Sequence, residues 1–462
     1  MGIALRAVDE VDEAIQAQER AVQLAPEEAR HRMNLAATKY VRGDMAGAAE
    51  SAAAALRLNP MNAKALNIWL AVEPIRNASD PRIATLEAHA AAGDRMDLDE
   101  RTLTHFDLFR VFDKLKDYDK AWGHLELGNR LAREEMEQRA QPGELPPPGY
   151  DRLQRTLLVR SFPAEVLQAL ADAADAARAA GQSLGAARDV LVLGNESAPI
   201  FVVGAYRSGS TLVESILSSH SKVHGAGENT AFSPLVARAS EHVGGFPGGL
   251  LEAARKDPLL LQRVGAEYVE EMLRHPAQRK SGKPRWVDKN LGNARMAGAI
   301  VLALPNARIV HTLRSPVATA FSMLSQHFTQ GSPAGRHFTT SQEDLAEHYR
   351  EHTALMRHWE AVLPPGRMLT VRYEDLVRDQ EAASRRLVAF AGLEWEDGCL
   401  QFHKAERSVS TASMSQVRRP MYNSSVEGWR RYEGRLGPLM EGLRGLDEAP
   451  WATEQWPPAE GA

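Results

Sequence analysis

One octet constrains the fold of this chain more than any other segment. It reads GAYRSGST (residues 204–211), follows the apolar run Pro199 to Val203, and precedes a helix-like run from Leu212 to Ser219. Its glycines and its terminal Thr211 have the spacing of the phosphate-binding loop G-x-x-x-x-G-K-[ST]. Glycines there let successive backbone N–H groups curl around an anion, and the following helix N-terminus adds its positive dipole end. The sequence therefore predicts a strand, a phosphate-binding loop and a helix, in that order.

The loop departs from the nucleoside-triphosphate pattern at one position. Ser210 stands where those enzymes carry the Lys that reaches the β- and γ-phosphates. Arg207 lies inside the loop instead, which predicts a nucleotide with phosphates but no γ-phosphate. The residues that we expect to contact this nucleotide here are Arg207, Ser208, Gly209, Ser210 and Thr211.

Composition narrows the class of protein. The chain has 462 residues, a net charge of −5 and 25% charged residues, with no block of like charges that would attract nucleic acid or a membrane surface. Its only cysteine, Cys399, excludes an intramolecular disulfide and fits a reducing compartment. The sequence has neither a visible signal peptide nor an apolar run of the ~18 residues that a membrane helix requires. These features predict a cytoplasmic protein that does not bind nucleic acid.

The first 140 residues are expected to form an all-α repeat domain. Ala14 and Ala48, Ala21 and Ala55, Leu24 and Leu58, and Pro26 and Pro60 are each 34 residues apart. This period and these residue types resemble the tetratricopeptide repeat, and the alternative is an ordinary Ala-rich helical bundle. A third, looser unit is predicted within Phe109 to Leu131, where Tyr118, Ala121 and Gly128 occupy similar roles. Counting back from Pro26, the chain is expected to start inside a repeat.

The remainder reads as a linker followed by an α/β domain. Residues 141–149 are rich in Pro and Gly and predict a boundary, after which a helix is expected from Ser161 to Gly181. We predict a linker with connecting helices over 141–195 and a catalytic domain over 196–462. Its expected fold is a parallel sheet flanked by helices, because short apolar strands alternate with helical runs. The predicted strands are Ile200 to Gly204, Trp286 to Asp288, Arg308 to Leu313 and Met368 to Tyr373.

Chemically suggestive residues follow the loop at intervals, mostly at predicted strand ends, where parallel sheets bind their ligands. Glu228 comes after two glycines, and Lys289 directly follows a strand. Arg314 leaves another strand, and Ser322 lies eight residues further on, roughly two helical turns. That spacing lets a guanidinium and a hydroxyl converge on a second phosphate. Taken singly, a Glu after such a turn is more often solvated or a helix cap, and a Lys in such a place is more often exposed.

Together these motifs resemble the sulfotransferases that use 3′-phosphoadenosine 5′-phosphosulfate (PAPS). The resemblance covers residues 199 to about 435 and is greatest for the bacterial subgroup with an N-terminal tetratricopeptide region, with similarity also to the protein-tyrosine sulfotransferases. GAYRSGST resembles the family's 5′-phosphosulfate loop, with Tyr206 in place of the usual Pro, and LRSPVATAFS its 3′-phosphate motif. The resemblance implies that Arg314 and Ser322 bind the 3′-phosphate and that Tyr373 contacts the donor.

The resemblance extends to catalysis and to the C-terminal part. It implies that Glu228 is the catalytic base, that Lys289 is the catalytic Lys, and that Ser413 contacts a phosphate. The family usually has a basic residue just before a Trp here, whereas Gly428 precedes Trp429, and Arg430 or Arg431 is the candidate substitute.

The implied reaction is an in-line transfer of a sulfuryl group to an acceptor hydroxyl. Glu228 would accept the proton, and Lys289 and the loop would offset charge on the leaving oxygen, with Arg207 positioning the 5′-phosphate. His220, His224 and His311 are the alternative bases. No Asp-x-Asp signature indicates a required divalent ion, so we expect a reaction without a metal.

Two other functions compete with this one. A small-molecule kinase on a related nucleotide fold would need a loop Lys and carboxylates for magnesium. A repeat scaffold with an inactive catalytic domain is the alternative that is not an enzyme. The acceptor stays open among peptide tyrosine, carbohydrate and small molecules. The repeats are expected to bind a peptide-like substrate or a partner subunit, which includes a second copy of the chain in a homodimer, and to take no part in the chemistry. On this interpretation, a protein truncated near Leu184 would still bind the nucleotide if it folds.

Overall fold

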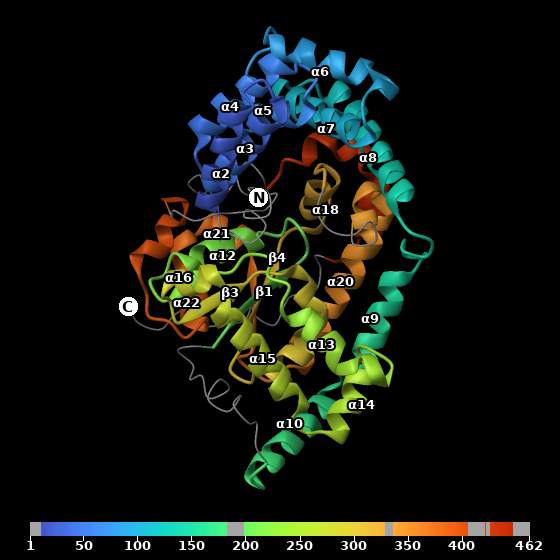
Figure 1. The fold of residues 1–462 in the computed structure, drawn as a ribbon. Helices are drawn as coiled ribbons and strands as arrows, with labels where there is room; N and C mark the ends of the chain where they lie inside the picture. The colour runs from blue at the N-terminus through green and yellow to red at the C-terminus, as the bar shows by residue number, and fades with distance from the viewer. Residues whose placement is uncertain (1–10, 183–197, 329–335, 405–420, 422–425, 447–462) are drawn as a thin grey trace.

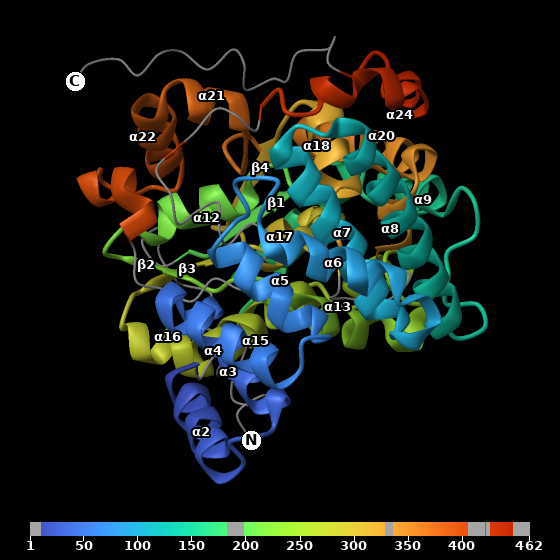
Figure 2. The same ribbon diagram turned by 90° about the horizontal axis from the view of Figure 1, so that it is seen from above.

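The computed structural model describes residues 11–182, 198–328, 336–404, 421 and 426–446. Its N-terminal part is entirely helical. Residues 11–139 arch over one end of a parallel α/β part, as Figures 1 and 2 show from two directions, and residues 150–179 run along one side of it (Figure 1). The helices of this N-terminal part are α2 (Val11–Leu24), α3 (Ala29–Arg42), α4 (Met45–Leu58), α5 (Ala63–Val72), α6 (Pro81–Ala91), the 3₁₀ helix η1 (Gly93–Arg95), α7 (Leu98–Leu115), α8 (Tyr118–Arg139), α9 (Tyr150–Ser161) and α10 (Ala164–Ala179).

The first two helix pairs repeat with the predicted period. Helices α2 and α4 end at Leu24 and Leu58, and α3 and α5 begin at Ala29 and Ala63, so both offsets are 34 residues. Ala14 and Ala48 are fully buried at equivalent positions. In the α7–α8 pair, a methyl group on Gly128 would lie only 3.2 Å from the Phe106 ring. Small residues thus allow close helix packing, while the assignment to the tetratricopeptide class stays a prediction.

Five parallel strands form the sheet of the second part, in the order β2-β3-β1-β4-β5. The four predicted strands are present, although the last ends at Arg372 and Tyr373 already begins a helix. A fifth strand, β2, has only three residues and was not predicted from the sequence. The strands are β1 (Ile200–Gly204), β2 (Val223–Gly225), β3 (Arg285–Asp288), β4 (Arg308–Leu313) and β5 (Met368–Arg372).

Helices cover both faces of this sheet. They are α12 (Ser210–Ser218), α13 (Phe232–Ser240), α14 (Gly248–Lys256), α15 (Leu260–Arg274), α16 (Pro276–Ser281), α17 (Ala297–Ala303), α18 (Pro316–Leu324), α20 (Gln342–Val362), α21 (Tyr373–Arg378), α22 (Gln380–Phe390) and α24 (Gly437–Gly442), with the 3₁₀ helices η3 (Glu241–Val243), η4 (Leu291–Met296), η5 (His337–Thr340), η6 (Asp397–Lys404) and η7 (Arg430–Arg435). None of the described helices is long and apolar enough to cross a membrane.

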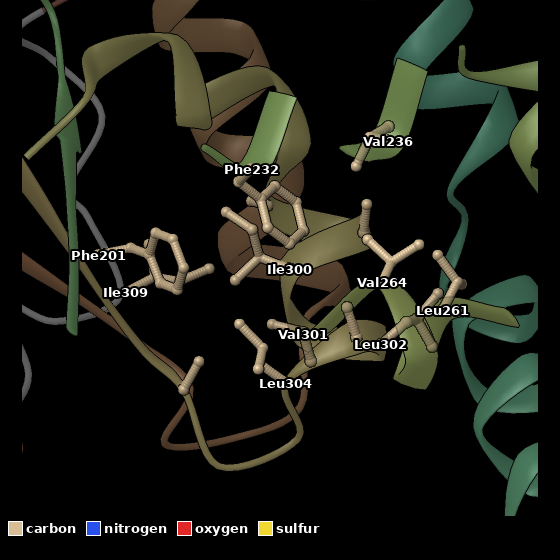
Figure 3. Packing of buried hydrophobic residues seen from close by; sticks show 14 of the residues in the cluster. Phe201, Phe232, Val236, Leu261, Val264, Ile300, Val301, Leu302, Leu304 and Ile309 are labelled. Carbon is tan, nitrogen blue, oxygen red and sulfur yellow. The ribbon is translucent and has the colours of Figure 1, made fainter. Parts of the chain in front are cut away.

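Strand β1 lies between two cores because its side chains alternate in direction. Phe201 and Val203 belong to the core that contains α13, α15 and α17 (Figure 3). Ile200 and Val202 belong to the core on the opposite face, which contains α12 and α22. All five residues of the strand are buried, which explains why the sequence there is continuously apolar.

The helical part shares its cores with the sheet part. Leu158, Phe162 and Leu167, from α9, its C-cap and α10, lie in the same apolar cluster as Phe201 of β1. Removing residues 1–183 would expose this core, so we no longer expect a fragment that starts near Leu184 to fold. The predicted domain boundaries themselves stay predictions. One expected helix also differs: Pro163 separates α9 from α10, because proline lacks the N–H that a helix interior needs.

A glycine between two helices provides a test of this packing. A methyl group on Gly265 of α15 would lie 2.1 Å from the carbonyl oxygen of Ala303 at the end of α17. We expect Gly265→Ala to lower the free energy of unfolding by about 1–3 kcal/mol, as overpacked cores do. The matched variant is Gly123→Ala in α8, where a methyl group meets nothing within 4 Å. Denaturant unfolding should show that variant to be neutral or slightly stabilised, and equal stability of the two variants would contradict this packing.

Candidate functional site

The loop after β1 is fixed by a close approach of its backbone to β4. Gly204 has a φ of 153°, and a methyl group there would lie 2.4 Å from the Thr312 hydroxyl oxygen. Ser208 Oγ donates to the carbonyl of Ala205 at 2.6 Å and lies 2.7 Å from Thr312 Oγ1. The Ser208 hydroxyl, predicted to contact the nucleotide, therefore anchors the loop in this structure.

The loop then turns into α12 with its backbone in the left-handed region. Arg207 has a φ of 66°, which is uncommon for a residue with a side chain, and Gly209 has a φ of 101° as the N-cap of the helix. Val213 makes the first helical hydrogen bond, to the carbonyl of Gly209. The amides before it, which include those of Ser210 and Thr211, lie at the helix end, where the dipole favours an anion.

Four residues predicted to bind the donor meet beside this loop. Arg207 Nε donates to the Oγ atom of Ser322, a residue of α18, at 3.1 Å. Arg314 Nη1 donates to the carbonyl of Arg207 at 3.2 Å, and its guanidinium lies 4.9 Å from the centre of the Tyr373 ring. Tyr373 also packs on Gly209, where a methyl group would approach its ring to 2.8 Å. Two arginines thus lie together next to a helix N-terminus, which suits the binding of phosphate groups.

Two further residues orient this arginine pair and were missed in the sequence. Tyr349 of α20 donates its hydroxyl to the carbonyl of Arg314 at 2.8 Å. Glu374 accepts from the backbone N–H of Ser315 at 2.9 Å. Both contacts fix the turn between β4 and α18, and the contact with α20 joins residues 35 positions apart. No local sequence signal indicates such a pairing.

Glu228 and Lys289 form an ion pair at the ends of β2 and β3. Lys289 Nζ lies 2.6 Å from Glu228 Oε1, with the Lys side chain 1% exposed and the Glu side chain 48% exposed. The backbone N–H of Lys289 donates to the carbonyl of Gly227, whose own N–H donates to Glu214 Oε1. Gly227 has a φ of 65°, which favours glycine. This turn brings a solvent-accessible carboxylate to a buried ammonium group.

Asp288, next to Lys289, is the centre of a buried network that the sequence analysis missed. It accepts from the Tyr268 hydroxyl at 2.9 Å, from Asn293 Nδ2 at 3.1 Å and from the N–H of Asn290 at 3.2 Å. Trp286 Nε1 donates to the Tyr268 hydroxyl oxygen. Burial raises the pKa of Asp288 to about 7. These contacts fix the β3 end that carries Lys289.

Two of the three candidate histidine bases have other roles in the structure. His220 donates from Nε2 to the carbonyl of Glu394 at 2.9 Å and accepts from the N–H of Lys222 at Nδ1. His311 is 1% exposed in the middle of β4, and burial holds its pKa well below the usual value. His224, on β2, is half-buried. These contacts favour Glu228 over His220 and His311 as the base.

The structure supports the predicted C-terminal phosphate-contacting residues less than it supports the others. Ser413 lies outside the described residues. Arg430 lies 3.3 Å from Glu427, and Arg431 lies 3.1 Å from Asp113 of α7. Both candidate substitutes for the basic residue before Trp429 thus pair with carboxylates in this structure.

A chamber of about 610 Å³ opens next to the loop and is formed jointly by the two parts of the chain. The N-terminal part contributes Arg133 of α8 and the segment from Pro146 to Asp151, and the loop contributes Gly204 to Tyr206. Partial burial of the Tyr206 hydroxyl and, in addition, the charge of Glu228 raise its pKa. The other walls consist of Leu291, Gly292, Ala294, Arg295, His337, Phe338, Asp344, Glu347, His348 and His352.

Comparison with known proteins gives one family. Residues 199–397 match the model described as "Sulfotransferase family". A protein-tyrosine sulfotransferase of Drosophila melanogaster is 24% identical over 240 residues, which are 48% of this chain and 43% of that protein. Residues 199–397 thus belong to the sulfotransferase family.

Other relatives extend the region of similarity and do not identify a function. A protein of Aquifex aeolicus (strain VF5), described as uncharacterized, is 35% identical over 359 residues, 74% of this chain and 41% of that protein. Since 74% of the chain exceeds the part after residue 198, the match includes some of the helical region. Among solved structures, the sulfotransferase domain of the Synechococcus PCC 7002 olefin synthase is 18% identical and covers 50% of this chain and 87% of that chain, with a TM-score of 0.35. The chain spans about two fifths of the first two curated relatives named here.

The raised pKa of Asp288 predicts how stability depends on pH. The folded protein holds this proton up to about pH 7, whereas an unfolded Asp loses it near pH 4. The contribution of Asp288 is therefore present below about pH 4 and is lost as the pH rises to about 7.

In the wild type, the contribution of Asp288 to the free energy of unfolding should change by an amount on the order of a few kcal/mol between about pH 4 and pH 7. Asp288→Asn should remove this change and so flatten the profile of stability against pH. Denaturant unfolding of both proteins from pH 4 to 8 measures it. Asp107, whose pKa burial raises to about 6, contributes to the slope in both proteins. Parallel profiles would show that Asp288 is charged in the folded protein.

Proposed function

We propose that the protein transfers a sulfuryl group from PAPS to an acceptor hydroxyl. The observation that carries this proposal is the contact between the two predicted phosphate motifs, where Arg207 of the loop donates to Ser322 of α18 and Arg314 binds the loop backbone. PAPS carries anionic groups at both the 5′ and 3′ positions of one nucleotide. An arginine pair between a helix N-terminus and a serine hydroxyl fits such a ligand.

The residues divide the work of binding between the two ends of the donor. The loop amides from Gly209 to Thr211 and the guanidinium of Arg207 would bind the 5′-phosphosulfate. Arg314 and Ser322 would bind the 3′-phosphate. Ser208 would act indirectly, by holding the loop on β4 through Thr312. Tyr373 would support both ends, because its ring lies against Gly209 and beneath Arg314.

Glu228 and Lys289 would perform the chemistry. The acceptor hydroxyl attacks sulfur in line with the bridging oxygen, and the S–O bond to the 5′-phosphate breaks as the new S–O bond forms. Glu228 takes the proton of the hydroxyl. Lys289, buried and within 2.6 Å of Glu228, donates to the bridging oxygen as negative charge develops there. Burial strengthens this interaction because little water screens the charge.

The acceptor would enter through the chamber beside Tyr206. Its walls combine aromatic and proline surfaces with charged pairs, such as Arg133 with Asp344 and His348 with Asp151 at 2.8 Å. Such walls suit a peptide that presents a phenolic side chain. Relatives at 24–26% identity, the Drosophila melanogaster protein among them, are described as protein-tyrosine sulfotransferases, which also supports a tyrosine acceptor.

An acceptor panel tests this class directly. Labelled PAPS and the full chain would be incubated with tyrosine peptides, simple phenols and carbohydrates. We expect transfer to the peptides and phenols, with higher kcat/KM for the peptides. Transfer to carbohydrate alone would overturn the tyrosine proposal and leave sulfuryl transfer intact.

Binding measurements on an Arg314 variant test which nucleotide the protein binds. The protein should bind adenosine 3′,5′-bisphosphate more tightly than ATP, because the loop lacks the lysine that holds a γ-phosphate. Arg314→Ala should weaken bisphosphate binding by about 1.5–3 kcal/mol through loss of a charge-assisted contact. The control is Arg308→Ala, at the opposite end of the same strand. Calorimetry that gives ATP equal affinity, with no loss in Arg314→Ala, would favour the kinase alternative.

Substitution of Glu228 tests which residue acts as the catalytic base. We expect Glu228→Gln to reduce turnover by about 10²–10⁴-fold while bisphosphate affinity stays near that of the wild type. Glu241→Gln, which removes an exposed carboxylate from η3, serves as the control. Circular dichroism should accompany the assay, since Lys289 loses its counter-ion in the first variant. If Glu228→Gln keeps most activity and His224→Ala abolishes it, the base is the histidine.

A further inference from the structure

We propose that Asp99, Glu135 and His327 bind a divalent transition-metal ion, such as zinc, where the helical part meets the sulfotransferase domain. The residues come from α7, from α8 and from the segment after α18, so they are far apart in the sequence. One ligand atom from each lies within 4.8 Å of the other two. None of the three lines the chamber.

The buried atoms of this cluster have unused bonding capacity. Glu135 is 3% exposed and His327 is 7% exposed. Glu135 Oε2 and both ring nitrogens of His327 make no hydrogen bond. Buried polar atoms nearly always have a partner, because their desolvation otherwise remains uncompensated. An ion between them would supply that partner.

The spacing favours an ion over a direct hydrogen bond. His327 Nε2 lies 3.8 Å from Glu135 Oε2, which is beyond hydrogen-bond range. Zinc binds imidazole nitrogen and carboxylate oxygen at about 2.0–2.2 Å. At the tetrahedral angle two such bonds span roughly 3.4 Å, so an ion fits between the two atoms after a small movement of the side chains.

The ligand types indicate the class of metal. One imidazole with two carboxylates suits zinc or another first-row transition metal. Calcium and magnesium prefer sites made only of oxygen. The ring of His327 is already oriented, since it stacks on Phe106 at 5.3 Å between centres and 7° between planes.

Two cations hold the carboxylates from outside. Arg139 Nη1 binds Glu135 Oε1 at 2.5 Å, which leaves Oε2 facing the histidine. Lys64 Nζ lies 2.8 Å from Asp99 Oδ2, and its side chain is 49% exposed. Arg139 would orient its carboxylate as outer partners of metal ligands do. Lys64 can turn to solvent when the ion binds.

Such an ion would rigidify the contact between α8 and the segment after α18, and the arrangement of the candidate site depends on this contact. Glu135 is on α8, as is Arg133 in the chamber wall. His327 follows α18, which carries Ser322, the partner of Arg207. The ion would therefore hold the acceptor side and the donor side of the site in one arrangement, without contact with the reacting atoms.

Metal titration of the full chain tests this site. The protein, prepared without a histidine tag and dialysed against a chelator that is then removed, would be titrated with zinc chloride by calorimetry. Tm would be recorded at each zinc concentration. We expect one tight site and a Tm that rises with zinc. Glu135→Gln should weaken binding at least about tenfold. Glu134→Gln, the exposed neighbour on the same helix, should bind zinc like the wild type.

Two outcomes would overturn the proposal. One is equal zinc affinity in the wild type and in Glu135→Gln, which would assign the ion to other histidines. The other is no tight binding at all, which would show that the cluster does not hold a metal ion. Should Glu135→Gln fail to fold, Asp99→Asn gives the same comparison, because Asp99 is only half-buried at the start of α7.

Discussion

The close approach of Gly204 to Thr312 is the constraint on which the rest of the site depends. A side chain at Gly204 would overlap the Thr312 hydroxyl, so only glycine lets β1 continue into the loop at this distance from β4. Ser208 then closes the loop onto the same threonine. These two contacts with Thr312, which together form a clamp, determine the backbone path at Arg207 and the start of α12. Because β4 continues into Arg314, the clamp also fixes the separation of the two arginines.

Much of the site was predictable because parallel strands end at one edge. Gly204, Lys289, Arg314 and Tyr373 each stand at or just after a strand end, and the alternation of apolar runs with helical runs identified those strands. The short strand β2 was missed because three residues carry no periodic signal. The Asp288–Tyr268 contact and the Tyr349–Arg314 contact were missed for another reason. They join side chains of separate elements, and nothing in the local sequence of either partner indicates the pairing.

The relation between the two parts of the chain also lay beyond the sequence. The 34-residue period described helices that pack on each other, and it suggested a region outside the chemistry. In the structure, Phe106 and Trp122 of the helical part share a core with Phe321 of α18, and Arg133 borders the same chamber as Tyr206. Periodicity reports which faces are apolar and does not report which surface covers them. The helical part therefore contributes both to the stability of the sulfotransferase domain and to one wall of its chamber.

The charges around Lys289 show how such a site can keep a buried cation available. An ammonium group that is 1% exposed needs a partner, since an unpaired buried charge is costly. Asp288 is adjacent in sequence but accepts from three other donors. Lys289 pairs instead with Glu228, whose carboxylate is half exposed and can rotate. The buried ammonium group of Lys289 thus pairs with a carboxylate that can move away from it. If the proposed chemistry is correct, Glu228 turns to the acceptor hydroxyl while Lys289 turns to the bridging oxygen, so that substrate binding exchanges one ion pair for two reacting contacts.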